Sequence, residues 1–439
     1  MGITPTTKAQ VSGHRFLTRR IEHGLVLGDI RMIHDPLASR KRAQTFGLTA
    51  TGIVCLGAIV LALLKPAIDP GDASIIRSES GQLYVRIDDQ LHPVANLASA
   101  RLIVGEAADV QDSSDRILKD LPKAVPVGIL DAPGLVAPPD SERQELVIHA
   151  CHTVGVAASR LDSAPSEVTV LLQESAARSG FSALGADRAV LAAVDQAEWL
   201  VGADGRRLLP PADTPVGRNI RHRLGITPSM VRWMPPPQLF SAIVERAPIA
   251  VPPGVSEVLR IPGAREPQLW ARIFDGVVRL TPVQADILID AGVYLRDGTA
   301  TELGQDPDSK ALAALPLPDR VPTWVDPTAQ PLCVGDDGGV AVAGSPGGSG
   351  PADSGWGETI ALAGAAVATR FSGPGWAVGV DTGSGVHVVS AHGLRHQVAD
   401  RATVETLGIS HLYSISWDIL RLLPSGTTLS KEQALRPLY

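Results

Sequence analysis

The sequence has few aromatic and few charged residues, and it lacks the motifs of common catalytic sites. Aromatic residues make up 4% of its 439 residues and charged residues 19%. It contains no Gly-x4-Gly-Lys-Ser/Thr segment, so it has no P-loop for phosphates. No Gly-x-Ser-x-Gly elbow is present either, and Gly180–Gly185 misses that spacing by one residue. A net charge of −7 gives no indication of nucleic-acid binding. We therefore expect no catalytic residues and no cofactor.

The charge is unevenly divided around one long apolar run. Residues 1–44 carry a balance of +5, and the rest of the chain carries −12. Between these zones, Thr45–Leu64 is free of charged residues and would span about 30 Å as a helix, the thickness of a bilayer core. Arg40, Lys41 and Arg42 precede the run and only Lys65 follows it. The positive-inside rule predicts a single-pass membrane protein with a cytosolic N-terminus and the bulk of the chain, residues 65–439, on the other side.

Local signals place the ends of this helix and argue against two other readings. Asp35 is a suitable N-cap, Pro36 suits the first turn, and Pro66 would end the helix. A cleaved signal peptide is disfavoured because its basic region would be far too long. A lipid anchor at Cys55 is disfavoured because Val54 stands where a small residue is needed. Cys55 is better explained as a small apolar packing residue.

The cytosolic tail contains a candidate amphipathic helix. Ser12 is a candidate N-cap, and Leu17, Ile21 and Leu25 recur at a spacing that aligns them along one helix face. We expect this helix to dock on a cytosolic partner surface. Binding to anionic lipid and a passive solvated tail are the alternatives. The candidate docking residues are Arg15, Phe16, Leu17, Arg19, Arg20, Ile21 and Leu25.

Four stretches of the outer part share one pattern: an apolar strand, a tight turn, a second strand and a short helix. We name them modules 1 to 4; they cover Leu83–Gly105, Trp199–Ile226, Leu269–Gly292 and Val386–Ile409. Three turns end in glycine, which suits hairpins that need positive φ. The helices tend to end on glycine as well. Irregular spacing argues against a tight solenoid and favours four ββα modules around a β-rich core.

The predicted fold class is therefore α+β: a cytosolic helix, a transmembrane helix and an elongated domain beyond the membrane, with a β-rich central core and four repeat modules. The expected core strands are Val125–Leu130, Leu146–Cys151, Glu167–Leu172, Ala189–Val194, Leu239–Val244 and Thr359–Ala363. Gly335–Gly357 is rich in Gly, Ser and Asp and is expected to be a flexible loop.

Only two cysteines lie outside the membrane, Cys151 and Cys333. In an oxidising compartment such a pair normally forms a disulfide. His149 and His152 flank Cys151, which raises the question of a zinc site. Structural zinc needs four nitrogen or sulfur ligands, and a disulfide would remove Cys151. We therefore expect a disulfide, ordinary histidines and no bound metal.

Three stretches carry a resemblance to a known family. They are Thr6–Leu37 (TTKAQVSGHRFLTRRIEHGLVLGDIRMIHDPL), Gln82–Gly105 (QLYVRIDDQLHPVANLASARLIVG) and Trp417–Leu435 (WDILRLLPSGTTLSKEQAL). On these motifs the chain resembles the EccB component of the mycobacterial type VII (ESX) secretion machinery. The order and spacing hold over nearly the whole chain, whereas the middle is more diverged.

The resemblance implies that the membrane is the inner membrane and that residues 65–439 form a periplasmic domain. It also implies EccC, EccD and EccE as partners in one inner-membrane complex, with the mycosin protease nearby. It also maps the family's cysteine pair onto Cys151 and Cys333. We expect the periplasmic domains to self-associate. The chain ends soon after the Leu-Ser-Lys motif and lacks the proline-rich extension often found there.

Two functional hypotheses follow, with a weaker third. The first is a structural component that links the cytosolic assembly to a periplasmic scaffold or gate for protein export. The second is a periplasmic ATPase, because the family often carries that label, although the sequence offers no P-loop for ATP. The third is a cell-wall binding module, since small repeats on an anchored domain suit glycan contact.

Overall fold

The computed structural model describes residues 6–28, 30–31, 36–63, 68–134, 145–154, 166–174, 180–263, 266–310, 315–343, 356, 358–364 and 366–439. The chain divides into two compact units, residues 1–69 and residues 70–439.

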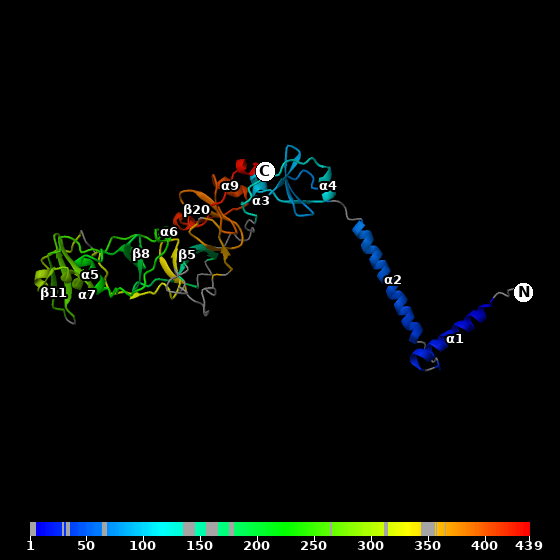
Figure 1. Ribbon diagram of the computed structural model, residues 1–439, viewed down its shortest axis with the longest axis horizontal. Helices are drawn as coiled ribbons and strands as arrows, with labels where there is room; N and C mark the ends of the chain where they lie inside the picture. The colour runs from blue at the N-terminus through cyan, green and yellow to red at the C-terminus, as the bar shows by residue number, and fades with distance from the viewer. Residues whose placement is uncertain are drawn as a thin grey trace. The chain divides into compact units, whose positions relative to one another are not determined.

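The first unit consists of two helices, drawn in blue in Figure 1: α1 (Lys8–Leu27) and α2 (Pro36–Leu63). Thr7 caps α1 through a reciprocal bond pair with Gln10, so the helix begins before the predicted cap at Ser12. Within α2, Ser39–Leu61 is long and apolar enough to cross a membrane. Helix α2 begins at the predicted Pro36, while the expected signals at Asp35 and Pro66 lie outside the described residues.

The second unit confirms the predicted α+β class and its four modules, but each module has more strands than expected. In each module, two further strands extend the sheet beside the hairpin. The first is antiparallel to the neighbouring hairpin strand, and the second is parallel to the first. The extra strands are irregular in length, and in module 2 the parallel strand comes from residues far along the chain. Sequence periodicity therefore identified only the local part of each module.

Modules 1 and 4 have the same plan. Module 1 contains β1 (Ile75–Ser78), β2 (Leu83–Ile87), β3 (Gln90–Val94), α3 (Leu97–Val104) and β4 (Gln111–Ser113). Module 4 contains β20 (Val378–Asp381), β21 (Val386–Val389), β22 (Arg395–Gln397), α9 (Arg401–Thr406) and β23 (Leu412–Ser414). Their helices α3 and α9 contact each other, and one apolar core runs through both modules.

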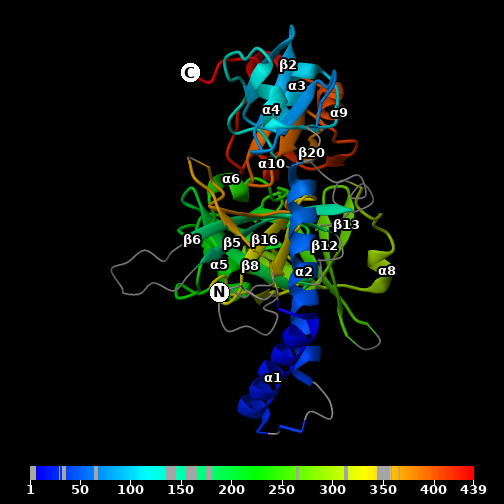
Figure 2. The ribbon, with the colours of Figure 1, turned by 90° about the vertical axis from the view of Figure 1, so that its right-hand side faces the viewer.

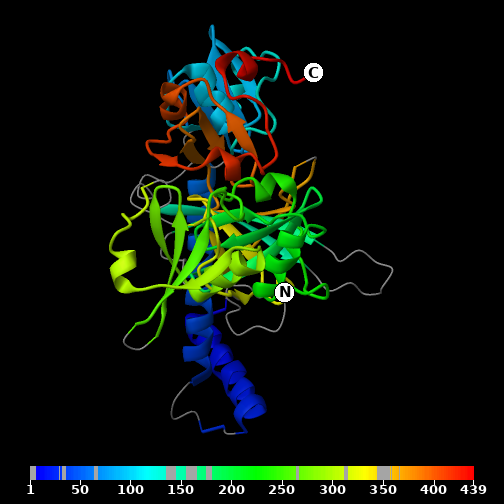
Figure 3. The same ribbon diagram turned by 90° about the vertical axis from the view of Figure 1, so that its left-hand side faces the viewer.

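Modules 2 and 3 form a second pair. Module 2 contains β8 (Arg188–Val194), β9 (Ala197–Gly202), β10 (Gly205–Leu208), α5 (Pro215–Arg223) and β15 (Thr323–Trp324). Module 3 contains β11 (Glu257–Ile261), β12 (Gln268–Ile273), β13 (Gly276–Leu280), α7 (Pro282–Asp290) and β14 (Tyr294–Asp297), and it is drawn in yellow-green in Figure 3. Helices α5 and α7 contact each other over a shared core. The four repeats thus pack as two pairs.

A separate sheet of seven strands forms the central core; its strands β5, β6 and β16 are labelled in Figure 2. The order is β18 (Ile360–Ala361), β19 (Arg370–Ser372), β6 (Ser166–Glu174), β5 (Leu146–Val154), β16 (Leu332–Gly335), β17 (Val340–Ala343) and β7 (Phe181–Ala183). Its longest pairing joins β5 and β6 over nine residues each. Buried aliphatic side chains of this sheet pack against elements of modules 2 and 4.

Short helices complete the second unit. They are α4 (Asp115–Asp120), α6 (Pro237–Phe240), α8 (Ala300–Leu303), α10 (Trp417–Leu420) and α11 (Lys431–Ala434). After α4, α6, α8 and α10, the chain makes an isolated parallel pairing with the outer hairpin strand of the corresponding module. This pairing recurs in all four modules, so the segment after each short helix is also part of the repeat.

Several expected core strands are corrected by the structure. Leu239–Val244 is not a strand: α6 begins at Pro237, where proline suits a first helical turn. Ala189–Val194 is a strand, β8, but it belongs to module 2. Val125–Leu130 makes only isolated pairings at Val127, and Pro126 lacks the amide that a ladder needs. Thr359–Ala363 contributes only the short β18.

The predicted flexible loop Gly335–Gly357 is wrong at its start. Residues Val340–Ala343 form β17, which pairs with both β16 and β7. Alternating burial, with Val340 and Val342 inside, explains why this glycine-flanked segment is a strand. Most of the remaining predicted loop lies outside the described residues.

Candidate functional site

The predicted docking stripe lies on the surface of α1. Leu17, Ile21 and Leu25 are 56%, 62% and 82% exposed, respectively, and Phe16 beside them is 53% exposed. Leu17, Ile21 and Leu25 are one helical turn apart, so they form a continuous apolar strip. An uncovered strip of this kind is typical of a surface that binds another molecule.

Basic side chains lie off the strip on α1. Arg15, Arg19 and Arg20 are all exposed; Arg20 is one turn from Leu17, and Arg15 and Arg19 share another face of the helix. On the same unit, Lys41 of α2 forms an ion pair with Glu22 of α1, with 2.6 Å between Nζ and Oε2. The helix therefore presents an apolar strip and exposed positive charge, a combination suited to an acidic or amphipathic partner.

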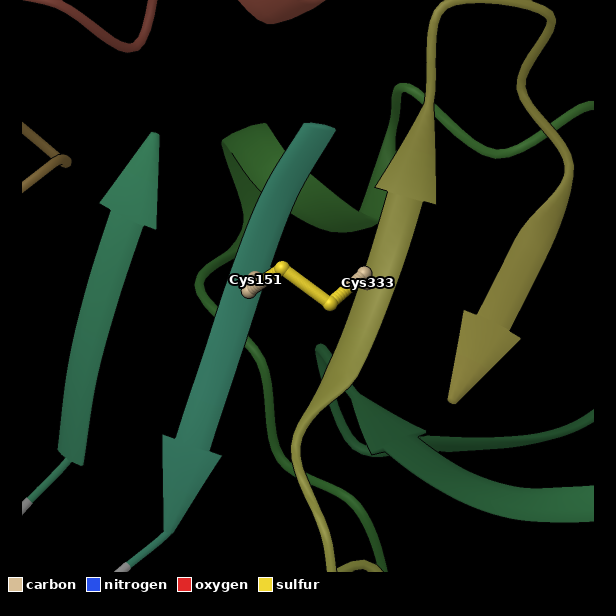
Figure 4. The surroundings of a disulfide bond; sticks show 2 residues. All are labelled: Cys151 and Cys333. Carbon is tan, nitrogen blue, oxygen red and sulfur yellow. A yellow bond between two sulfur atoms is a disulfide. The ribbon is translucent and has the colours of Figure 1, made fainter. Parts of the chain in front are cut away.

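The predicted disulfide is present in the central sheet (Figure 4). Cys151 of β5 and Cys333 of β16 are directly opposite each other, with their Cα atoms 3.9 Å apart. Both side chains are fully buried. The bond joins residues separated by 182 positions and encloses modules 2 and 3 within the loop. It therefore holds the two halves of the core together at the middle of the sheet.

The histidines beside Cys151 have ordinary structural roles. His149 stacks on Phe181, with ring centroids 4.4 Å apart. His152 is buried: its Nδ1 accepts a hydrogen bond from Trp233 Nε1 at 2.9 Å, and its Nε2 lies 2.6 Å from Ser166 Oγ. Burial lowers the pKa of His152 to about 4, so its ring is neutral at neutral pH. Within the described ranges, no group of three or more His, Cys, Asp or Glu side chains is placed to hold a metal ion.

Polar contacts connect the modules within each pair. Arg101 of α3 donates from Nη1 to the Leu407 carbonyl of module 4 at 2.7 Å. Arg223 of α5 makes ion pairs with Asp286 and Asp290 of α7, at 2.9 and 2.5 Å. These contacts fix the helices against one another beyond what apolar packing alone specifies.

Arginine and aromatic side chains hold two of the short helices against the outer hairpin strands of their own modules. The Arg206 guanidinium of β10 lies 5.2 Å from the Trp199 ring of β9 and 4.6 Å from the Phe240 ring of α6. In module 4, Arg395 of β22 lies 5.0 Å from the ring of Trp417 in α10. Such cation–π contacts are strongest when shielded from water. Modules 2 and 4 thus share this contact between hairpin and short helix.

Module 3 contains an ion-pair network that the sequence did not reveal. Arg272 and Arg296 bridge Glu257 and Glu302, and Arg272 also pairs with Asp306. The hydrogen bond from Arg296 is the main reason that the pKa of Glu302 falls to about 2. The partners come from β11, β12, β14 and α8, so only folding brings them together. Their sequence positions give no signal of this.

The fold and these surfaces define a class: a repeat protein with one candidate membrane-spanning helix, an exposed apolar strip on the preceding helix and a disulfide-braced second unit. Comparison with known proteins identifies the family. Residues 3–437 match the family described as "Type VII secretion system ESX-1, transport TM domain B". The chain therefore belongs to the EccB family and is a membrane component of type VII secretion.

Curated relatives agree with this assignment. The chain is 30% identical to the "ESX-1 secretion system ATPase EccB1" of Mycolicibacterium smegmatis (strain MKD8), covering 99% of this chain and 95% of that protein. It is 29% identical to the protein of the same name from Mycobacterium tuberculosis (strain ATCC 25618 / H37Rv), with the same coverage.

Solved structures share the fold. A chain in "Structure of an intact ESX-5 inner membrane complex, Composite C3 model" matches with a TM-score of 0.68 and 25% identity, covering 100% of this chain and 97% of that one. A chain in "Structure of EccB3 dimer from the ESX-3 core complex" matches with a TM-score of 0.66 and 22% identity, covering 83% of this chain and 100% of that one.

Proposed function

We propose that this protein is a structural component of the type VII secretion inner-membrane complex, in which it links a cytosolic assembly to a periplasmic scaffold or gate. The observation that carries the proposal is the uncovered apolar strip of Leu17, Ile21 and Leu25 on α1. The uneven charge around α2 supports the orientation, with the basic N-terminal zone in the cytosol and residues 65–439 in the periplasm.

The partners proposed for α1 are the cytosolic parts of EccC, EccD and EccE. The apolar strip would lie in a groove on one of them, and the exposed arginines of α1 would select an acidic rim. On the periplasmic side, the paired modules are proposed to self-associate and to lie near the mycosin protease. A matching solved chain that is titled a dimer supports the self-association.

Deletion of residues 1–44 tests the docking role. The second unit, residues 70–439, has its own cores and its own disulfide, so it should fold without the tail. We expect the truncated chain to reach the membrane with an intact disulfide but to be absent from the purified complex. A complex assembled at the normal level without residues 1–44 would contradict the docking role.

Nucleotide hydrolysis is a second candidate function, favoured by the names of the relatives. If the outer domain is an ATPase, purified full-length protein should hydrolyse ATP above a matched blank. The activity should then follow the protein through a sizing column. Hydrolysis that separates from the protein on that column would identify a contaminant.

A further inference from the structure

A cavity of about 740 Å³ opens on the surface of module 2. Leu208, Leu209 and Ile226 form an apolar part of its wall. Its rim includes Ala212 and Pro228, which are both exposed, so the cavity is open to solvent. Its volume lies within the roughly 300–1,000 Å³ of ligand pockets in proteins.

Three charged side chains lie together in the wall of this cavity: Glu198 of β9, Arg221 of α5 and Arg232. Glu198 Oε2 accepts a hydrogen bond from Arg221 Nε at 2.9 Å, and its Oε1 accepts one from Arg232 Nε at 3.1 Å. Burial alone would raise the pKa of Glu198, but these hydrogen bonds lower it below its ordinary value. Glu198 is therefore ionised, and the cluster carries two positive charges and one negative charge.

The corresponding positions of module 3 are occupied by leucine. Modules 2 and 3 align at the glycine that ends each hairpin turn, and this register places Glu198 on Leu269. Their helices align at the capping threonine, which places Arg221 on Leu288. Leu288 is buried in the apolar core of the module pair, and Leu269 packs against that core.

The parallel pairing beside the first strand of each module gives the third correspondence. At equivalent positions of these strands, the parallel partner is Trp233 in module 2 and Arg296 in module 3. The preceding residues, Arg232 and Leu295, therefore correspond, and Leu295 also packs against the core. Because module 3 forms the same fold with three leucines, the fold does not require the three charges of module 2.

Module 2 also contains an insertion at this cavity. Between its hairpin and its helix cap it has Pro210–Asp213, whereas Leu280 and Thr281 are adjacent in module 3. The inserted residues form one rim of the cavity. Arg221 Nη1 donates a hydrogen bond to the Pro210 carbonyl at 2.5 Å, so the charged cluster also holds the insertion in place.

Arg232 has hydrogen-bond donors left for a ligand. Its Nη1 donates to the carbonyls of Pro228 and Met230, at 2.8 and 2.5 Å. Among the described residues, no protein atom accepts a hydrogen bond from its Nη2. Asp213 also lines the cavity, but on the exposed rim, while the arginine pair lies further inside. A bound carboxylate would balance the unmatched inner charge.

We propose that this cavity binds a peptide segment of a partner protein in which an apolar side chain lies next to a glutamate or aspartate. The carboxylate accepts hydrogen bonds from Arg232 Nη2, and the apolar side chain packs against Leu209 and Ile226. Hydrogen bonds between ionised groups are roughly twice as strong as neutral ones, so the arginine selects the acidic residue. This site in the second unit goes beyond the proposed docking through α1 and does not depend on it.

The test uses the full-length protein in detergent and calorimetric Kd values for two peptides of equal shape, acetyl-Leu-Glu-Leu-amide and acetyl-Leu-Gln-Leu-amide. We expect the glutamate peptide to bind at least tenfold more tightly, with a smaller difference at high salt. Acetyl-Ser-Glu-Ser-amide, which lacks the apolar side chains, should bind at least tenfold more weakly than the first peptide. Bound glutamate peptide should slow hydrogen exchange at residues 226–232 and leave the equivalent residues 293–296 unchanged.

A variant with the leucines of module 3 separates binding from folding. The triple substitution Glu198→Leu, Arg221→Leu and Arg232→Leu should keep the unfolding temperature, because apolar residues often replace a buried ion cluster without loss of stability. It should raise the Kd of the glutamate peptide at least tenfold. The matched control removes two arginines and one glutamate from exposed positions of the second unit and should leave Kd within twofold. Its substitutions are Arg401→Gln, Arg436→Gln and Glu405→Gln.

Each part of the proposal has a result that would overturn it. A stable leucine variant with an unchanged Kd, or no binding of the glutamate peptide to the unaltered protein, would overturn the site. Equal binding of the glutamate and glutamine peptides would overturn the role of the arginines. Equal binding of the leucine and serine peptides would overturn the role of the apolar wall. These peptide comparisons use the unaltered protein, so they decide the matter even if the leucine variant does not fold.

Discussion

At the scale of single residues, buried histidines are the most sensitive points of the outer domain. His152, His387 and His396 are all at most 7% exposed, and burial is the main cause of the lowered pKa of each. Burial disfavours the charged form of each ring in the folded chain. These roles were not predictable from sequence. The hydrogen-bond partners of His152, for example, are Trp233 and Ser166, which are 81 and 14 positions away along the chain.

Acid should destabilise the outer domain through His152. Its pKa is about 4 when folded and about 6.5 when unfolded, so below pH 6.5 the unfolded chain binds the proton first. The free energy of unfolding should therefore fall as the pH drops from 6.5 to 4, by about 1 kcal/mol per pH unit from this residue. Urea titrations at several pH values measure the slope.

The substitution His152→Gln removes this titrating group, so it should reduce the slope by about 1 kcal/mol per pH unit. The substitution His14→Gln on α1, outside the second unit, is the matched control and should leave the slope unchanged. An identical slope in all three proteins would show that His152 does not set the acid response.

Gly426 is required by the packing of His396. A β-carbon at Gly426 would overlap the His396 imidazole, which is fully buried and donates from Nδ1 to the Thr427 carbonyl at 2.8 Å. We expect Gly426→Ala to reduce the free energy of unfolding by about 1–3 kcal/mol, because the ring cannot move without losing that bond. Thermal or urea unfolding measures the loss.

The matched control for Gly426→Ala is Gly134→Ala, since a β-carbon at Gly134 would meet nothing within 4 Å. That control should change stability by less than about 0.5 kcal/mol. If the two substitutions change the free energy of unfolding equally, the overlap with His396 does not destabilise the protein.

At the scale of elements, turns and helix caps depend on neighbouring residues and can be predicted from sequence, whereas strand pairings between distant segments cannot. The hairpin glycines Gly205, Gly276 and Gly393 all have positive φ, as their turns required. The helix cap at Ser12 was misplaced because Thr7 and Gln10 form a complete capping box one turn earlier. Leu239–Val244 was read as a strand because a short apolar run fits both periods.

The disulfide is the element whose removal has the largest expected effect. Its loop spans 182 residues, and on the chain-entropy account the bond contributes about 5 kcal/mol. The double substitution Cys151→Ala with Cys333→Ala should lower the unfolding free energy by up to that amount. Reductant should lower the melting temperature of the unaltered protein to a similar level and leave the double variant unchanged. A melting temperature that is insensitive to both changes would contradict a bracing role.

At the scale of the whole molecule, the sequence predicted the membrane helix, the modules and the family, because these depend on composition and short motifs. The pairing of modules 1 with 4 and 2 with 3 could not be predicted. It depends on contacts such as Arg101 with Leu407, which are 306 positions apart. The parallel strand that β15 adds to module 2 also comes from beyond module 3.

This arrangement favours assembly over chemistry as the way the protein works. The disulfide joins β5 to β16 in the central sheet, and shared apolar cores hold the modules together in pairs. The strip on α1 is the most exposed apolar surface among the predicted site residues. Docking through the strip on α1 is therefore the proposed role that most needs a direct test.

The most direct test is the mass of the membrane complex purified with the substitution Ile21→Asp, compared with Ser12→Asp. Both residues are exposed on α1, but Ser12 lies on the helix face opposite the strip of Leu17, Ile21 and Leu25. We predict that the Ile21→Asp chain stays in the membrane with its disulfide formed and is missing from the complex, while Ser12→Asp assembles normally. A complex of full mass containing the Ile21→Asp chain at the normal level would contradict the account.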